Sequence, residues 1–294
     1  MHAFFQHLID SITVGSLYAV MGLSIALVFG IMRLVNFAQG DLVMVGAYGS
    51  AVFSHSPWIL TLIIVLVVPI AFALIIERVA FRPVRMASDS TLLVTSFAVS
   101  YLLESVVLLF LSATPRGVNL APALGHSFQV AGLFVPWLDV ATVSSTVVLL
   151  LALSWFLSKT RTGVFMRAAA EDFTTARLMG VRANRIIAVA FAISGLLTGV
   201  TAYLTVSKTG QVYPTMGINL LLVAFVATTI GGLGSLSGAV LGGYILGAIT
   251  IFIRAYFPAQ LANFTQAFTY LIVIAILVYR PQGLLTSRTN RTRV

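Results

Sequence analysis

Apolar residues occur in nine long runs along the chain, and these runs determine the structure that we expect. The runs cover residues 8–32, 40–55, 57–77, 91–113, 136–157, 186–206, 218–231, 238–257 and 262–279. An α-helix needs about 20 apolar residues to cross the hydrocarbon core of a bilayer. The pattern therefore predicts an all-α, polytopic transmembrane bundle of eight or nine spans, built as a single domain over residues 1–294.

Two of the runs, 40–55 and 218–231, are short for a full span, and both lie beside glycine-rich sequence. The first overlaps "NFAQGD" and the second continues into "IGGLGSLSGAVLGG". Paired interruptions in the two halves of a transporter often mark an internal repeat with the transport route between its halves. The sequence equally allows a simpler reason, which is close helix packing at the glycines. We expect broken or re-entrant segments at one or both places.

Composition and charge place the chain in a membrane. Hydrophobic residues make up 59% of it and charged residues only 9%, whereas soluble domains carry about a quarter charged residues. The net charge is +9, but 14 of the 17 basic residues fall at Arg33 or in the connections after the third, fifth and ninth runs. Short cytoplasmic loops concentrate Lys and Arg. We therefore expect the N-terminus outside, the C-terminus in the cytoplasm, membrane lipid as the surroundings and no nucleic-acid partner.

The longest polar stretch, at about 159–185, is expected to be a cytoplasmic loop that contains a short helix. Acidic residues suit its start, a basic residue suits its last turn, and a glycine suits a left-handed C-cap. The residues concerned are Glu171 and Asp172 at the start, Ala176, Arg177 and Met179 along the helix, and Gly180 at the end. Its small apolar face suits docking into the groove of a partner. The alternative is an amphipathic loop resting on anionic headgroups.

Five motifs occur in order along nearly the whole chain. They are "GLSIALVFGIMRLVNFAQGDLVMVGAY", "ERVAFRPVR", "RAAAEDFTTARLMGV" with "AFAISGLLTGVTAYL", "IGGLGSLSGAVLGG" and "YRPQGLL". Together they resemble the permease subunits of the branched-chain amino acid class of bacterial ABC importers. The resemblance implies a permease in the bacterial inner membrane that forms half of a translocation pore with a second, related permease. It also implies two cytoplasmic ATPase subunits, which bind ATP and magnesium, and a periplasmic substrate-binding protein.

The chain departs from this family pattern at two positions. Gln39 stands where the first motif usually has His, and Thr250 stands near a common Glu. Members of the family carry Leu, Ile and Val, and others in the wider group carry urea, short amides or aromatic acids. The resemblance therefore implies import of a branched-chain amino acid or a related small polar substrate.

The stretch "VNFAQGDLVMVGAY", residues 35–48, places polar residues where a buried helix would be expected. We expect a broken-helix element in the substrate pathway, with Asn36 and Gln39 bonding substrate or lining a gate and Gly40 supplying flexibility. Asp41 is expected to cap the helix that follows, because a carboxylate bonds free N–H groups at a helix start. The alternative is a plain cytoplasmic turn between two complete spans.

Two further sets of residues are candidates for a role in transport. Glu104 lies in the middle of the run 91–113, where an ionisable group costs roughly 2.5 kcal/mol or more unless it is neutral, paired or hydrated. It should face protein or a cavity, either in the pathway or in a structural hydrogen bond. Gly232, Gly238 and Gly242 remove side chains at helical spacings, so they are expected to form a hinge or a close-packing contact.

The sequence contains no pattern expected of an enzyme. No Walker A motif occurs, so ATP should be bound by another chain. The four histidines, His2, His7, His55 and His126, lack the spacing of metal ligands. The sequence also has no Gly-x-Ser-x-Gly motif, which would mark a nucleophilic serine. Two alternatives stay open, an ion-driven secondary carrier or channel and an intramembrane enzyme. Coupling to an ATPase would separate the importer from both.

Overall fold

The computed structural model describes residues 2–54, 56–111, 113–120, 125–130, 132–258, 264–280 and 283–285. His55, the start of the last apolar run at 262–263 and the C-terminal arginines beyond residue 285 lie outside the described residues. The longer helices are α1 (His2–Met32), α2 (Ala38–Val52), α3 (Trp58–Ile76), α5 (Asp89–Phe110), α6 (Trp137–Lys159), α9 (Ala183–Thr209), α10 (Met216–Gly231), α11 (Leu236–Tyr256) and α12 (Thr265–Tyr279). Shorter elements are the π-helical turn η1 (Glu77–Phe81), α4 (Arg82–Val84), α7 (Arg161–Glu171) and α8 (Phe173–Leu178).

Each of the nine apolar runs coincides with one of the longer helices, so the all-α membrane bundle is confirmed. Within the described residues, six helices are long and apolar enough to cross a membrane; they are α1, α3 with its continuation to Val84, α5, α6, α9 and α11. By contrast, α2 and α12 have 15 residues and α10 has 16. At 1.5 Å per residue, such helices are shorter than the roughly 30 Å hydrocarbon core. The number of full crossings stays a prediction.

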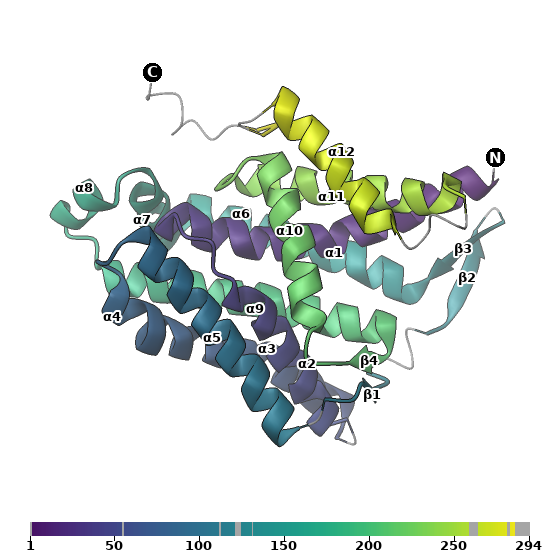
Figure 1. Ribbon diagram of the computed structural model, residues 1–294, viewed down its shortest axis with the longest axis horizontal. Helices are drawn as coiled ribbons and strands as arrows, with labels where there is room; N and C mark the ends of the chain where they lie inside the picture. The colour runs from purple at the N-terminus through teal and green to yellow at the C-terminus, as the bar shows by residue number, and fades with distance from the viewer. Residues whose placement is uncertain are drawn as a thin grey trace.

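Helix α1 is the centre of the bundle. It runs through the middle of the molecule, with α6, α9, α10 and α11 packed around it (Figure 1). Its contact with α11 depends on small residues, because a Cβ atom added at Gly243 would lie 2.6 Å from the backbone nitrogen of Ala19. One added at Gly15 would lie 2.8 Å from the Cα of Tyr244. Small residues let the backbones of membrane helices approach closely and so maximise van der Waals contact.

The predicted glycine set lies where α10 meets α11. A Cβ atom added at Gly242 would overlap the carbonyl oxygen of Ala227, and one added at Gly238 would overlap the carbonyl oxygen of Gly231. Both positions therefore pack against a helix of the same chain. Gly232 has another role, because its φ of 107° ends α10 in a conformation that L side chains rarely adopt. Whether the segment also bends as a hinge stays a prediction.

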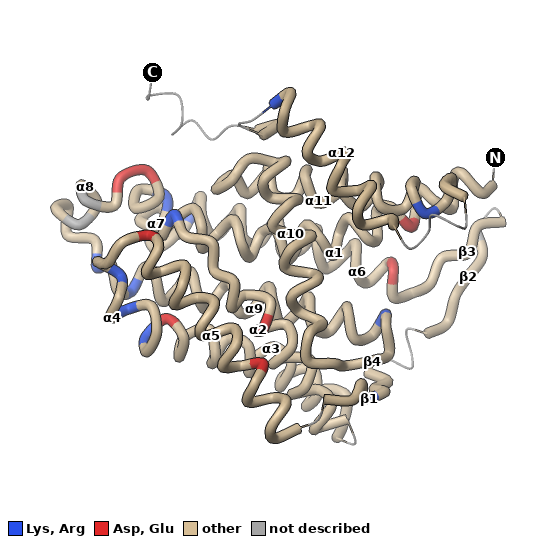
Figure 2. The backbone as a smooth tube through the Cα atoms, viewed as in Figure 1, with Lys and Arg blue, Asp and Glu red and all other residues tan. Residues whose placement is uncertain are grey.

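The two ends of the bundle differ in charge. Lys and Arg gather around α4 and α7, and fewer lie near the opposite end, where α1 begins (Figure 2). That opposite end carries two small antiparallel pairs, β1 (Arg116–Gly117) with β4 (Gln211–Val212) and β2 (Ser127–Val130) with β3 (Leu133–Pro136).

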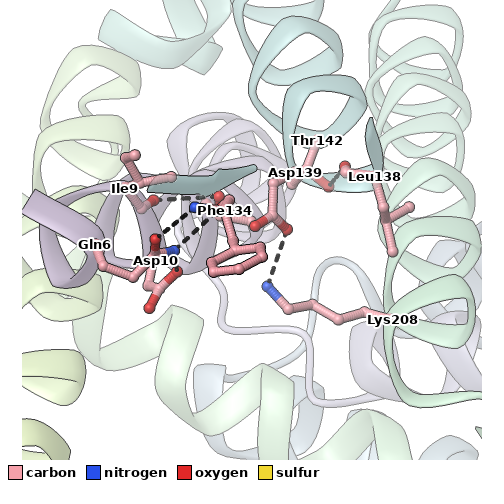
Figure 3. Close-up of polar contacts among 9 residues, drawn as sticks. Gln6, Ile9, Asp10, Phe134, Leu138, Asp139, Thr142 and Lys208 are labelled. Carbon is pink, nitrogen blue, oxygen red and sulfur yellow. Dashed lines mark hydrogen bonds and ion pairs between the residues drawn. The ribbon is translucent and has the colours of Figure 1, made fainter. Parts of the chain in front are cut away.

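Side-chain hydrogen bonds and an ion pair connect the elements at this second end (Figure 3). The side chain of Gln6 holds the hairpin to α1, since its Nε2 donates to the Phe134 carbonyl at 3.0 Å and its Oε1 accepts from the Phe134 N–H at 3.1 Å. Lys208 of α9 pairs with Asp139 of α6, with 3.5 Å between Nζ and Oδ1. The first contact joins α1 to β3, and the second joins α6 to α9, at the end opposite α4 and α7.

We predict that Gly242→Ala lowers the thermal stability of the purified protein. The added methyl group would overlap the Ala227 carbonyl, and such overpacking typically costs about 1–3 kcal/mol. Gly49→Ala is the matched control, because a Cβ there would lie 3.4 Å from Ile64, an ordinary contact. The measurement is the midpoint of thermal unfolding in detergent, followed by size-exclusion chromatography. Equal midpoints for both variants and the wild type would show that α10 and α11 are not packed through this glycine.

Candidate functional site

The backbone is interrupted between α1 and α2. α1 ends at Met32 near α7, residues 33–36 are not helical, and α2 begins beside α9 at Ala38 (Figure 1). The N–H of Arg33 donates to the Phe29 carbonyl at 2.7 Å, and that of Ala38 donates to Oδ1 of Asn36 at 3.1 Å. Irregular backbone at membrane depth requires such partners within the protein. A short non-helical connection thus joins α1 to α2, and the Asn36 side chain accepts from the first N–H of α2. Its depth in the membrane, and with it the choice between a broken helix and a plain turn, stays a prediction.

A cluster of polar side chains encloses the amide of Gln39. Its Nε2 lies 2.5 Å from the Ser24 hydroxyl and 2.6 Å from the hydroxyls of Ser194 and Thr198. Ser24 and Ser194 lie 2.9 Å apart, and hydroxyls both donate and accept, so the group can bond mutually. We call these four residues the Gln39 cluster. It joins α1, α2 and α9, and only 1% of Gln39 is exposed.

Asn36 and Gly40 complete the start of α2. Nδ2 of Asn36 lies 3.5 Å from Oε1 of Gln39, and Asn36 is also buried. A Cβ at Gly40 would lie 2.8 Å from the carbonyl oxygen of Gly217 in α10. Gly40 therefore allows a close approach of α2 to α10, a role that the sequence did not indicate. In the described conformation, these residues face protein rather than open space.

Asp41 lies within the first turn of α2 and not in front of it, so the expected N-cap role is wrong. The helix begins at Ala38, four residues before the start that this role requires, and the Asn36 side chain accepts from the Ala38 N–H. The side chain of Asp41 is enclosed, with 1% of the residue exposed. The side chains that interact with it are Ser100 and Glu104 of α5. Glu104, which is half-buried, lies close enough for its charge to act on Asp41 from a separate helix.

The long polar stretch at 159–185 contains two short helices, α7 and α8, rather than one. Thr160 caps α7, its Oγ1 accepting from the Gly163 N–H at 3.0 Å, and the alanine-rich sequence continues that helix through Glu171. The expectation that Glu171 starts the short helix is therefore wrong, because Glu171 ends α7. Asp172 follows in extended conformation and accepts from the Thr175 N–H at 3.1 Å, which caps α8.

The end and the surface of α8 are well defined. Gly180 has a left-handed φ of 85°, and the Val181 N–H donates to the Ala176 carbonyl at 3.1 Å, as a glycine C-cap requires. Ala176 faces inward with 6% exposed, whereas Leu178 and Met179 are 85% and 82% exposed. Arg177 lies in α8, but its side chain lies outside the described part. Together α7 and α8 make an elbow, defined here as residues 161–180, with two apolar side chains at its tip.

Sequence reasoning missed several of these residues. Leu178 follows the same apolar signal as Met179, and its exposure depends on how α8 packs. No sequence pattern pointed to the hydroxyls of the Gln39 cluster, because serine and threonine are common in membrane helices. Ser194 and Thr198 also lie more than 150 residues from Gln39 in the sequence. Only the tertiary packing of α1 against α9 brings these hydroxyls to the break.

The chain was compared with known proteins. The family profile described as "Branched-chain amino acid transport system / permease component" matches residues 7–278. The chain belongs to this permease family. The permease is 30% identical over 300 residues to the high-affinity branched-chain amino acid transport system permease protein BraD of Pseudomonas aeruginosa. The aligned region covers 97% of this chain and 96% of BraD. It is also 30% identical over 297 residues to LivH of Escherichia coli K12, covering 96% and 95% of the two chains.

The similarity extends to an archaeal relative and to a solved structure. The probable branched-chain amino acid transport permease protein LivH of Methanocaldococcus jannaschii is 28% identical, covering 93% of this permease and 90% of the relative. The structure titled "PsaBC from Streptococcus pneumoniae in complex with Fab" matches with a TM-score of 0.51 and 17% identity, over 99% and 94% of the chains. That match concerns the fold alone. The family expected from the motifs is confirmed, and this permease is a non-catalytic, multi-pass inner-membrane subunit of a transport system.

We predict that Gln39→Leu destabilises this permease. The substitution removes the amide from three buried hydroxyls, and a buried polar group left without its partner costs about 1–3 kcal/mol. Gln266→Leu is the control, because Gln266 is exposed on α12. Thermal unfolding in detergent should show a lower midpoint for Gln39→Leu and an unchanged or higher midpoint for Gln266→Leu. An unchanged midpoint for Gln39→Leu would mean that the cluster contributes nothing to the fold.

Proposed function

We propose that this permease forms half of the translocation pore of an ATP-driven importer in the bacterial inner membrane. Its substrate is a branched-chain amino acid or a related small polar molecule. The observation that carries this proposal is the family match over almost the whole chain, with relatives named for branched-chain amino acid transport. The partners are a second, related permease, two ATPase subunits that bind ATP and magnesium, and a periplasmic substrate-binding protein.

The proposed orientation places the basic end of the bundle in the cytoplasm. Arg78, Arg82 and Arg85 lie at this end with the elbow, and α1 begins at the opposite end (Figure 2). Basic residues are retained preferentially on the cytoplasmic side of bacterial membranes. The N-terminus is then outside, the C-terminus is cytoplasmic, and residues 1–294 act as one transmembrane domain.

The elbow is proposed to receive the movement of the ATPase. Leu178 and Met179 present apolar side chains at the basic end, where lipid tails do not cover them in this orientation. Exposed apolar side chains on a short helix suit insertion into a groove of a partner protein. Ala176, on the other side of α8, packs against the permease, so the helix is positioned between the two.

The start of α2 is proposed to line the substrate pathway. Amide and carboxyl groups lie inside the bundle here, from Asn36 and Gln39 and from Asp41 and Glu104. In the described conformation Asn36 and Gln39 are enclosed, so this part of the pathway is closed. Passage of substrate requires α2 to move relative to α1 and α9. Carboxyl groups in the pathway would attract the ammonium group of a zwitterionic amino acid.

The acidic pair also favours a second candidate function, an ion-driven carrier. Carboxyl groups inside a membrane bundle are a common feature of proton and ion pathways. Glu104 acts electrostatically on Asp41 from α5. The two functions differ in their energy source.

Uptake by proteoliposomes containing this permease and the partners that co-purify with it tests both candidates. We predict that labelled leucine accumulates only with ATP and that ionophores do not prevent it. Met179→Glu should lower the uptake rate about tenfold, because a charge in an apolar docking contact is costly to bury. Met86→Glu is the control, since Met86 is 84% exposed outside the elbow.

Three outcomes would contradict parts of this proposal. Uptake driven by an ion gradient without ATP would identify a carrier. ATP-driven uptake of another solute, with none of leucine, would change the substrate. Equal uptake by Met179→Glu, Met86→Glu and the wild type would show that α8 does not dock through Met179.

A further inference from the structure

Arg33 has an unusual backbone conformation. Its φ of 54° makes it the single non-glycine residue with positive φ in the described part of the chain. A side chain in this left-handed region crowds the following carbonyl, so the conformation costs free energy that glycine does not incur. The described positions with comparable φ are all glycines: Gly132, Gly180, Gly210, Gly232, Gly234 and Gly283. An outlier of this kind points to a role for the side chain.

The side chain of Arg33 reaches the elbow. Nη2 of its guanidinium donates to the carbonyl oxygen of Glu171 at 3.4 Å, across 138 residues of sequence. Glu171 is the last residue of α7, and the carbonyls in the last turn of a helix lack partners within the helix. A cation is also favoured there by the helix dipole. The contact therefore lies at the joint of the elbow, directly before the Asp172 cap of α8.

The backbone of Arg33 is attached to the start of α2. Three residues after it, Asn36 caps α2 through the Ala38 N–H and approaches Gln39. Leu34, which lies between Arg33 and Asn36 in the sequence, is buried, with only 5% of its surface exposed. A short, anchored stretch of chain thus joins the guanidinium contact to the Gln39 cluster. Displacement at one end of so short a segment has to change the other.

We infer that Arg33 is a positioning residue that links the elbow to the start of α2. Movement of α8 with its ATPase partner shifts the Glu171 carbonyl, and Arg33 carries this shift to Asn36 and Gln39. The start of α2 then separates from α1 and α9, which opens the polar segment. Arg33 touches no substrate in this scheme. The inference rests on the proposed coupling role of the elbow and adds the residue through which the coupling passes.

Arg33→Gly separates the role of the side chain from that of the backbone. Glycine adopts the left-handed conformation without strain, so the fold should keep or gain thermal stability. The variant is assembled with all partner subunits, and leucine uptake and ATP hydrolysis are measured in the same proteoliposomes. We expect ATP hydrolysis within about twofold of the wild type and uptake per ATP lowered about tenfold, a change within the range for residues that carry coupling between sites.

Two further variants sharpen the test. Arg33→Lys keeps a cationic donor for the Glu171 carbonyl, so it should restore a substantial part of the uptake per ATP. Arg82→Gly removes an exposed positive charge from α4, outside the elbow, and should leave the ratio unchanged. It controls for a general loss of charge at the basic end.

The possible failures can be told apart. An Arg33→Gly variant with the wild-type ratio of uptake to hydrolysis would overturn the inference while leaving the importer function intact. A parallel fall in uptake and hydrolysis, with the ratio preserved, would also overturn it, because Arg33 would then serve assembly. A wild-type complex without any ATP-driven uptake would refute the proposed function itself.

Discussion

The interruption between α1 and α2 is the constraint on which the rest of the structure depends. It places non-helical backbone and amide side chains inside an apolar bundle, where each unsatisfied polar group costs several kcal/mol. Asn36 supplies a cap to α2, and Gln39 bonds hydroxyls of α1 and α9. The polar start of α2 can be buried among these helices only because these partners are in place. The same bonds hold α2 against α1 and α9, and we propose that their release opens the substrate path.

The surrounding helices form a closely packed frame for this element. α1 approaches α11 through Gly15 and Gly243, and α11 approaches α10 through Gly242. Backbones in such contact have little freedom to move separately. The acidic residues Asp41 and Glu104 lie where α2 meets α5. The opposite face of α5 carries exposed apolar side chains. In the mechanism that we propose, transport moves the polar start of α2 against this packed frame, and the elbow at the basic end starts that movement.

The sequence allowed the helices to be located but only part of the site. Each apolar run became a helix because length and hydrophobicity leave few alternatives in a membrane. Gly180 was identifiable as a C-cap because its left-handed conformation favours glycine. Glu171 was misplaced because the alanine-rich stretch before it extends α7. Asp41 was misassigned because α2 starts at Ala38 with Asn36 as its cap. The hydroxyls of Ser194 and Thr198 could not be found, since tertiary packing alone brings them to Gln39.

The central claim is that the polar start of α2 opens and closes during transport, and site-specific labelling tests it most directly. The chain has no cysteine, so a water-soluble maleimide would report on one introduced at position 36, with Met86→Cys as an exposed control. The reaction at position 36 should be slow in the resting complex, because Asn36 is 5% exposed, and faster when ATP and the loaded binding protein are present. The claim would be contradicted if the labelling rate at position 36 were the same in every state. This holds both for labelling as fast as at position 86 and for no labelling at all.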